Sequence, residues 1–131
     1  MKLALGLGCD RGTPLATLQA CIAEALDKAG GTLAEVRAVA SIDLKADEHA
    51  LLELERQHGW KIHFYASFEL AAVPVPNPSE TVRRHTGTPS VSEAAALLAA
   101  HTDAADLIVE KHRLRGTDGR SATVSIARIP E

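Results

Sequence analysis

Residues 3–14 read Leu-Ala-Leu-Gly-Leu-Gly-Cys-Asp-Arg-Gly-Thr-Pro, and this stretch decides the fold. It opens with an apolar run from Leu3 to Gly8, which is typical of a strand covered on both faces. From Pro14 to Lys28 apolar residues recur every three or four positions, which indicates a helix. A buried strand that turns directly into a helix favours an α/β protein. The glycine-rich turn from Gly6 to Thr13 is then the candidate functional surface.

The pattern after residue 28 alternates strand and helix again and then changes. Strand–helix–strand connections require parallel pairing through right-handed crossovers. Gly116-Thr117-Asp118-Gly119, between two apolar runs, predicts an antiparallel hairpin. We therefore expect an α/β fold whose mixed sheet has parallel βαβ units, a C-terminal antiparallel hairpin and helices on both faces. The expected strands are 36–42, 60–65, 107–113 and 122–129, and the expected helices are 46–58, 80–85 and an alanine-rich helix ending at Ala100.

Three local features refine this prediction. Leu51, Leu52 and Leu54 are expected to be the buried side chains of the 46–58 helix. Prolines at 74, 76 and 78 exclude regular structure there and predict an extended loop. Ser90-Val91-Ser92-Glu93 has the form of a capping box at the start of the alanine-rich helix.

Composition limits the classes of function. A length of 131 residues with 46% hydrophobic content predicts a single domain over residues 1–131. A net charge of −3 and only 3% aromatic residues argue against nucleic-acid binding. No apolar run approaches the length of a membrane span, and two cysteines are too few for a disulfide scaffold. We expect a cytoplasmic protein with no nucleic-acid or membrane partner.

The turn after the first strand has the chemistry of an anion site. Gly6, Gly8 and Gly12 permit close approach of another molecule and positive φ angles. The helix that follows begins with unpaired amides, and Arg11 adds a planar donor fork for carboxylate or phosphate. The alternative is that the glycines only shape a tight strand-to-helix turn, and the sequence leaves both interpretations open.

No cofactor or metal motif accompanies this turn. Its spacing, Gly-x-Gly-x-x-x-Gly, is one residue longer than the dinucleotide fingerprint, and no P-loop Lys-Ser or Lys-Thr follows. Asp43, just after the second strand, stands where a ribose-binding acid sits in dinucleotide sites, but spacing alone makes that a weak match. The six histidines show no metal-ligand spacing. We expect no resident cofactor and no metal.

Four residues near this turn are candidates for chemistry. Cys9 lies close to a helix start, which lowers a thiol pKa and would make it a nucleophile. Asp47 and Glu48 are candidate acid–base groups, although their position at the expected helix start also suits simple capping. Lys45 is repelled by the same helix dipole, so it indicates an anionic partner or a structural pair with a carboxylate.

Four segments together resemble one family, formed by the cobalamin-biosynthesis protein CobE and the C-terminal domain of CbiG. They cover nearly the whole chain in family order, at the length of the stand-alone form. Two positions depart from the family pattern: Asp10 stands where a basic residue is common, and Glu110 where proline often precedes Lys111. The matching segments are Gly6-Leu7-Gly8-Cys9-Asp10-Arg11-Gly12-Thr13, Leu44-Lys45-Ala46-Asp47-Glu48, Pro89-Ser90-Val91-Ser92-Glu93-Ala94-Ala95-Ala96, and Leu107 to Lys111 with Ala122 to Ala127.

The resemblance implies a role in the aerobic route to the corrin ring of vitamin B12. Corrin intermediates carry acetate and propionate carboxylates around an apolar macrocycle, which Arg11, Lys45 and Lys111 beside an alanine-rich surface would complement. The matching segments add Ser90, Val91 and Glu93, with Thr13, to the expected binding residues.

Three hypotheses follow. The preferred one is a non-catalytic module that binds or hands over a corrinoid or precorrin intermediate. The second is an enzyme that acts on a precorrin, since CbiG as a whole resembles a lactone-opening hydrolase. The third is an interaction subunit for another enzyme of the cobalamin pathway.

Overall fold

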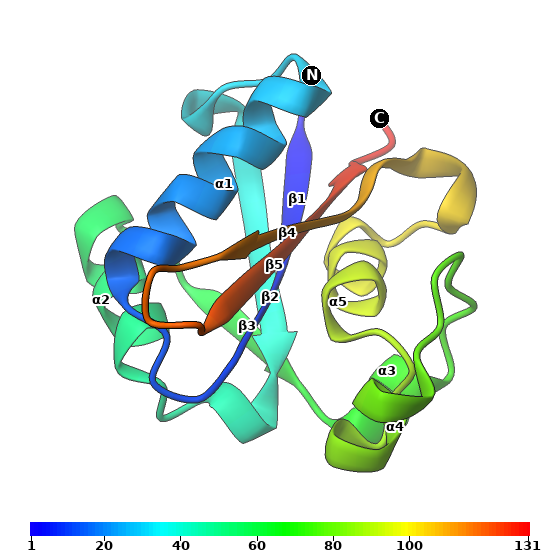
Figure 1. Cartoon of the computed structure of the whole chain (residues 1–131). Helices are drawn as coiled ribbons and strands as arrows, with labels where there is room; N and C mark the ends of the chain where they lie inside the picture. The colour runs from blue at the N-terminus through cyan, green and yellow to red at the C-terminus, as the bar shows by residue number, and fades with distance from the viewer.

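The computed structural model describes residues 1–131. Five strands form one mixed sheet in the order β3-β2-β1-β5-β4, with β1 at its centre (Figure 1). β1 and β2 are parallel, as are β2 and β3, whereas β5 is antiparallel to both β1 and β4. The predicted mixed sheet and C-terminal hairpin are therefore confirmed. The strands are β1 (Leu3–Cys9), β2 (Val36–Ile42), β3 (Ile62–Tyr65), β4 (Leu107–Arg115) and β5 (Ser121–Arg128).

Helices cover both faces of the sheet, as predicted. α1 and α2 lie on one face, and α5 lies on the other with α3 and α4 beside its N-terminal end (Figure 1). None of the helices is long and apolar enough to span a bilayer. The helices are α1 (Leu15–Ala29), α2 (His49–His58), α3 (Ser67–Ala71), α4 (Glu80–Thr86) and α5 (Val91–Ala100), with short 3-10 turns η1 (Leu33–Glu35), η2 (Asp43–Lys45) and η3 (Ala104–Asp106).

The larger core lies between the sheet and the α1–α2 layer. Leu5 and Leu7 of β1 pack there with Leu18 and Ile22 of α1 and Leu51 of α2, all of them buried. Successive residues of a strand point to opposite faces, so the residues that alternate with these leucines face the other layer. These residues are Ala4, Gly6 and Gly8, and their small size leaves room for a helix backbone.

α5 uses that room and lies directly on β1. A Cβ added at Gly6 would lie 1.8 Å from the carbonyl oxygen of Ser92 and 2.6 Å from the amide nitrogen of Ala96. The alanines of α5 from Ala94 to Ala96 are accordingly buried. The expected alanine-rich binding surface is therefore wrong, because these alanines form the contact between helix and sheet.

Three local predictions also need correction. The helix predicted from residue 46 begins at His49, because the backbone at Glu48 is still extended after the 3-10 turn η2. Leu52 is 44% exposed rather than buried, since the inward-facing stripe of α2 is Ala50, Leu51 and Leu54. The short helix α3 was not predicted, because five residues are too few to show a helical period.

The predicted capping box before α5 does not form. The Ser90 hydroxyl makes no cap hydrogen bond and has no hydrogen-bond partner in the protein. The Glu93 carboxylate instead accepts hydrogen bonds from the backbone amide (3.2 Å) and side-chain amide (2.7 Å) of Asn77. Glu93 therefore anchors the proline-rich loop to α5 rather than capping its own helix.

Candidate functional site

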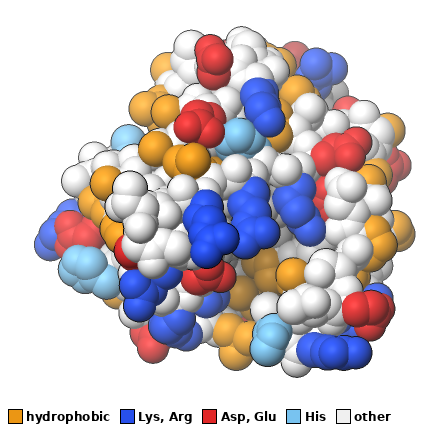
Figure 2. Space-filling view, in the orientation of Figure 1, with side chains coloured by type: hydrophobic (Ala, Val, Ile, Leu, Met, Phe, Trp, Pro, Cys, Tyr) orange, Lys and Arg blue, Asp and Glu red, His pale blue; other side chains and the backbone are white.

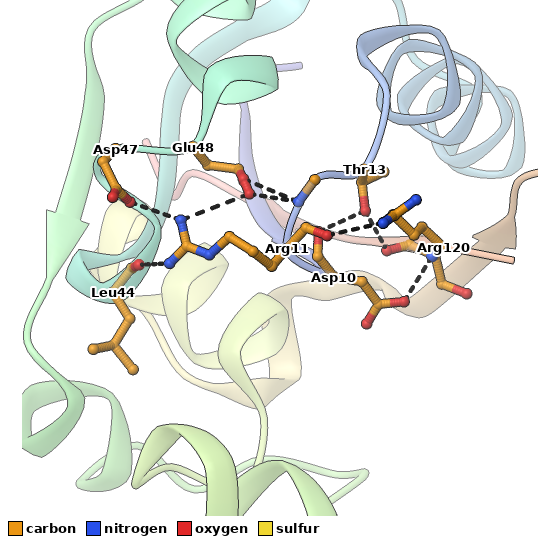
Figure 3. A network of polar contacts seen from close by, with 9 residues as sticks. Asp10, Arg11, Thr13, Leu44, Asp47, Glu48 and Arg120 are labelled. Atoms are coloured by element: carbon orange, nitrogen blue, oxygen red, sulfur yellow. Dashed lines mark hydrogen bonds and ion pairs between the residues drawn. The ribbon is translucent and has the colours of Figure 1, made fainter. Parts of the chain in front are cut away.

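Arg11 is held by groups from the segment that follows β2. Its guanidinium donates to the Asp47 carboxylate and to the Leu44 carbonyl, each at 2.8 Å (Figure 3). The hydrogen bond and charge of Arg11 lower the pKa of Asp47, and Asp47 raises the pKa of Arg11 in turn. The pair is exposed to solvent, so it contributes little stability by itself. Two donor groups of Arg11 are therefore already hydrogen-bonded to other residues of the protein.

The Glu48 carboxylate is bound by a turn amide that was expected to bind an external anion. Its carboxylate accepts from the backbone N–H of Gly12 at 2.8 Å and lies 3.7 Å from the Arg11 guanidinium (Figure 3). Glu48 is only 4% exposed, so this internal carboxylate takes the place of an external one. Gly12 itself has a φ of +79°, a conformation that favours glycine.

The other side of the turn is fixed by the β4–β5 hairpin. The Asp10 carboxylate accepts from the Ser121 amide at 2.8 Å, and the Arg120 side chain donates to the Arg11 carbonyl at 3.1 Å. The Thr13 hydroxyl donates to the Asp10 carbonyl at 2.7 Å. Asp10, the first departure from the family pattern, thus ties the turn to β5. These bonds support the alternative in which the turn is chiefly structural.

A cleft of about 640 Å³ opens beside this turn, on the α5 face of the sheet beyond the N-terminus of α5. Its volume falls within the range of small-molecule sites. Gly8 and Thr123, which face each other across β1 and β5, form its floor, and α4 forms one wall. Its lining residues are Gly8, Cys9, Asp10, Arg11, Lys45, Ser79, Thr81, Val82, His85, Thr86, Val91, Ser92, Lys111, Arg113, Ser121 and Thr123.

The cleft is positively charged although the chain is acidic. Four Lys and Arg side chains line it against one carboxylate, while the whole chain carries a net charge of −3. Lys45, Lys111 and Arg113 form no ion pair within the protein, and the Lys111 ammonium donates only to the Asn77 carbonyl. Figure 2 shows a row of Lys and Arg side chains across this face, over β4, above a hollow. These unpaired cations are available to an anionic ligand.

The surroundings of Cys9 do not favour the thiolate form of its side chain. Burial raises the pKa of its thiol to about 11, and the nearby charge of Lys45 offsets this only in part. The structure therefore differs from the expected low-pKa thiolate, because Cys9 is the last residue of β1 and packs against the α1-side core. No three His, Cys, Asp or Glu side chains lie close enough together to hold a metal ion.

The structure brings half of the predicted binding residues together. Gly8, Cys9, Arg11, Lys45, Val91 and Lys111 line the cleft, whereas Gly6, Gly12, Thr13, Asp43, Ser90 and Glu93 do not. The α4 wall and Arg113 were missed. Arg113 had a usable signal, since it lies two residues from Lys111 on a strand and therefore faces the same side.

The family model described as "Cobalamin synthesis G C-terminus" matches residues 3–127. The chain belongs to this family. The resemblance noted from the sequence motifs is thereby confirmed, and with it a place among cobalamin-biosynthesis proteins.

Relatives of this family member fall into long and short forms. A cobalt-precorrin-5A hydrolase from Priestia megaterium is 36% identical over 128 residues, which span 98% of this chain but only 32% of that protein. Protein CobE from a Sinorhizobium species is 41% identical over 111 residues, which span 83% of this chain and 71% of that protein. A crystal structure of CobE, from the cobalamin pathway, covers 99% of this chain and 93% of its own with 34% identity and a TM-score of 0.76.

Proposed function

We propose that the cleft binds a corrinoid or precorrin intermediate of cobalamin biosynthesis through the carboxylates at the rim of its macrocycle. The observation that carries this proposal is the set of three unpaired cations, Lys45, Lys111 and Arg113, around a hydroxyl-rich cleft in an acidic chain. Hydrogen bonds between charged partners are each worth about 1.5–3 kcal/mol, so a few carboxylate contacts supply useful affinity.

Binding and transfer to a pathway enzyme fit the site better than catalysis. The raised pKa of Cys9 keeps its thiol protonated near neutral pH. Asp47 and Glu48, the candidate acid–base groups, are engaged with Arg11 and the Gly12 amide. The hydrolase name belongs to a protein of which this chain spans about a third, so the remaining two thirds of that relative supply ample room for its chemistry.

The proposal is tested by titrating the protein with cobyrinic acid, a corrin with free carboxylates, and following its visible spectrum or the heat of binding. We expect saturable binding that weakens as salt rises, because the contacts are electrostatic. The methyl ester of cobyrinic acid, which has the same ring without the charges, should not bind. Equal binding of acid and ester, or no binding of the acid, would contradict the proposal.

Variants locate the site. Lys111→Ala together with Arg113→Ala should weaken binding about a hundredfold, at roughly tenfold per lost charged contact. Lys61→Ala is a matched control, because Lys61 is an exposed cation that does not line the cleft. An equal loss of affinity in the control would indicate a non-specific charge effect.

A further inference from the structure

The cleft holds no Phe, Trp or Tyr side chain on which the flat face of a macrocycle could stack. Only three of its sixteen residues are hydrophobic, and the others are polar, charged or glycine. The apolar face of α5 is buried against the sheet. Trp60 and Tyr65 stack on His58 and His63 and take no part in the cleft. The side chains that distinguish the cleft are therefore its cations and hydroxyls, which suit polar groups at a ligand's edge.

The floor of the cleft is shaped by a missing side chain. A Cβ added at Gly8 would meet only the Cβ of Thr123, at an ordinary 3.9 Å, and Gly8 has no positive φ. Nothing in the backbone conformation therefore requires glycine at this position. What the glycine does is leave space above the middle strand of the sheet.

Cations stand on both sides of that space. Lys45 follows β2, which neighbours β1 on one side, while Lys111 and Arg113 belong to β4 on the other side. Gly8 lies on β1, between them in the order of the strands. An acidic arm placed over Gly8 would thus be flanked by positive charge from two directions.

We infer that the cleft holds the corrinoid edge-on, with a rim carboxylate over Gly8 and both faces of the ring outside the protein. This inference rests on the proposed function and adds the orientation of the ligand. It gives that function a mechanism, because a ligand gripped by its rim stays open to a second protein that recognises its faces.

Gly8→Ala tests the contact at the floor. The variant should fold without strain, but its added methyl group should occupy the space of the acidic arm. Affinity for cobyrinic acid should therefore fall about tenfold or more, while the melting temperature stays near that of the native protein. Lys61→Ala, outside the cleft, is again the control and should keep the native affinity. Native affinity in a folded Gly8→Ala protein would overturn the inference.

The rate of cyanide binding to the cobalt of bound cobyrinic acid tests the orientation. Edge-on binding leaves both axial positions open, so both should take up cyanide within about twofold of the rate for free cobyrinic acid, seen as the change to the dicyano spectrum. Protection of one or both axial positions by about tenfold would bury a face and overturn the orientation alone. An axial bond to His85, detected as a spectral shift lost in His85→Ala, would do the same. If the native protein does not bind cobyrinic acid, the proposed function fails and this inference with it.

Discussion

Gly6 and Gly8 lie two residues apart on the same face of β1, yet they serve different ends. The backbone of α5 lies so close to Gly6 that it occupies the space of a side chain. The N-terminal end of α5 does not extend over Gly8, which is left open. One glycine therefore lets a helix pack on the sheet, and the other lets a cleft form beside it. A repeated motif of small residues on one strand can thus combine packing and binding, and the covering helix decides which applies at each position.

The largest effect is expected at the covered position. Gly6→Ala would place a methyl group 1.8 Å from the Ser92 carbonyl, a backbone atom that cannot move without shifting α5. We expect the free energy of unfolding to fall by about 3 kcal/mol or more, at the upper end of overpacking effects. Urea denaturation followed by circular dichroism measures it. A native-like midpoint would show that α5 can lift from the sheet, and the contrast with Gly8 would disappear.

The second prediction concerns the support of the turn between these regions. Glu48→Ala removes the acceptor of the Gly12 amide in a nearly buried place, which should lower the free energy of unfolding by about 2 kcal/mol. Glu48→Gln retains an acceptor oxygen at that position and should lose less. Equal losses in the two variants would mean that the negative charge beside Arg11, and not the hydrogen bond to Gly12, is what stabilises the turn.

Much of the fold could be predicted from the sequence because its signals are local. The apolar run of Leu3 to Gly8, the helical periods and the glycine–aspartate hairpin each depend on neighbouring residues. The start of α2 was missed for a local reason, since the backbone is extended at Glu48 after the 3-10 turn η2. The capping box failed because Asn77, 16 residues away, takes the Glu93 carboxylate.

The site was predictable only where strand topology places residues together. Lys45 and Lys111 follow or lie on strands of one sheet, so their joint presence at the cleft follows from the fold class. The pairing of Arg11 with Asp47 joins residues 36 positions apart, and no local pattern predicts it. The α4 wall likewise depends on the path of a proline-rich loop that has no regular period.

The third prediction uses pH to test how far the fold shields the Cys9 thiol at the end of β1. Below about pH 9 the Cys9 thiol is protonated in both the folded and the unfolded chain. Between about pH 9 and the folded pKa of about 11, the unfolded chain loses this proton and the folded chain keeps it. The free energy of unfolding should therefore decline with rising pH across this window, by up to about 2 kcal/mol from this group.

Cys9→Ala isolates the contribution of this thiol to the pH dependence of stability. Its stability should decline less steeply than that of the native protein between pH 9 and 11, as measured by urea denaturation at each pH. Cys21→Ala is the comparison, since burial also raises the pKa of Cys21 to about 11. Identical slopes in the native protein and in Cys9→Ala would mean that the Cys9 thiol ionises as readily in the fold as outside it, and catalysis by this thiol would regain support.

The smallest effect on stability is expected at the open position, and it sharpens the comparison most. Gly8→Ala adds a methyl group in ordinary contact with Thr123 and restricts the unfolded chain, so the free energy of unfolding should change by no more than about 0.5–1 kcal/mol, in the stabilising direction. Measured beside Gly6→Ala, the same chemical change on the same strand should thus have opposite signs. A large loss of stability at Gly8 would indicate that the cleft is more tightly closed than its lining suggests. A small gain in stability together with weakened binding of cobyrinic acid would mean that glycine at position 8 serves ligand binding, since the fold gains no stability from the missing side chain.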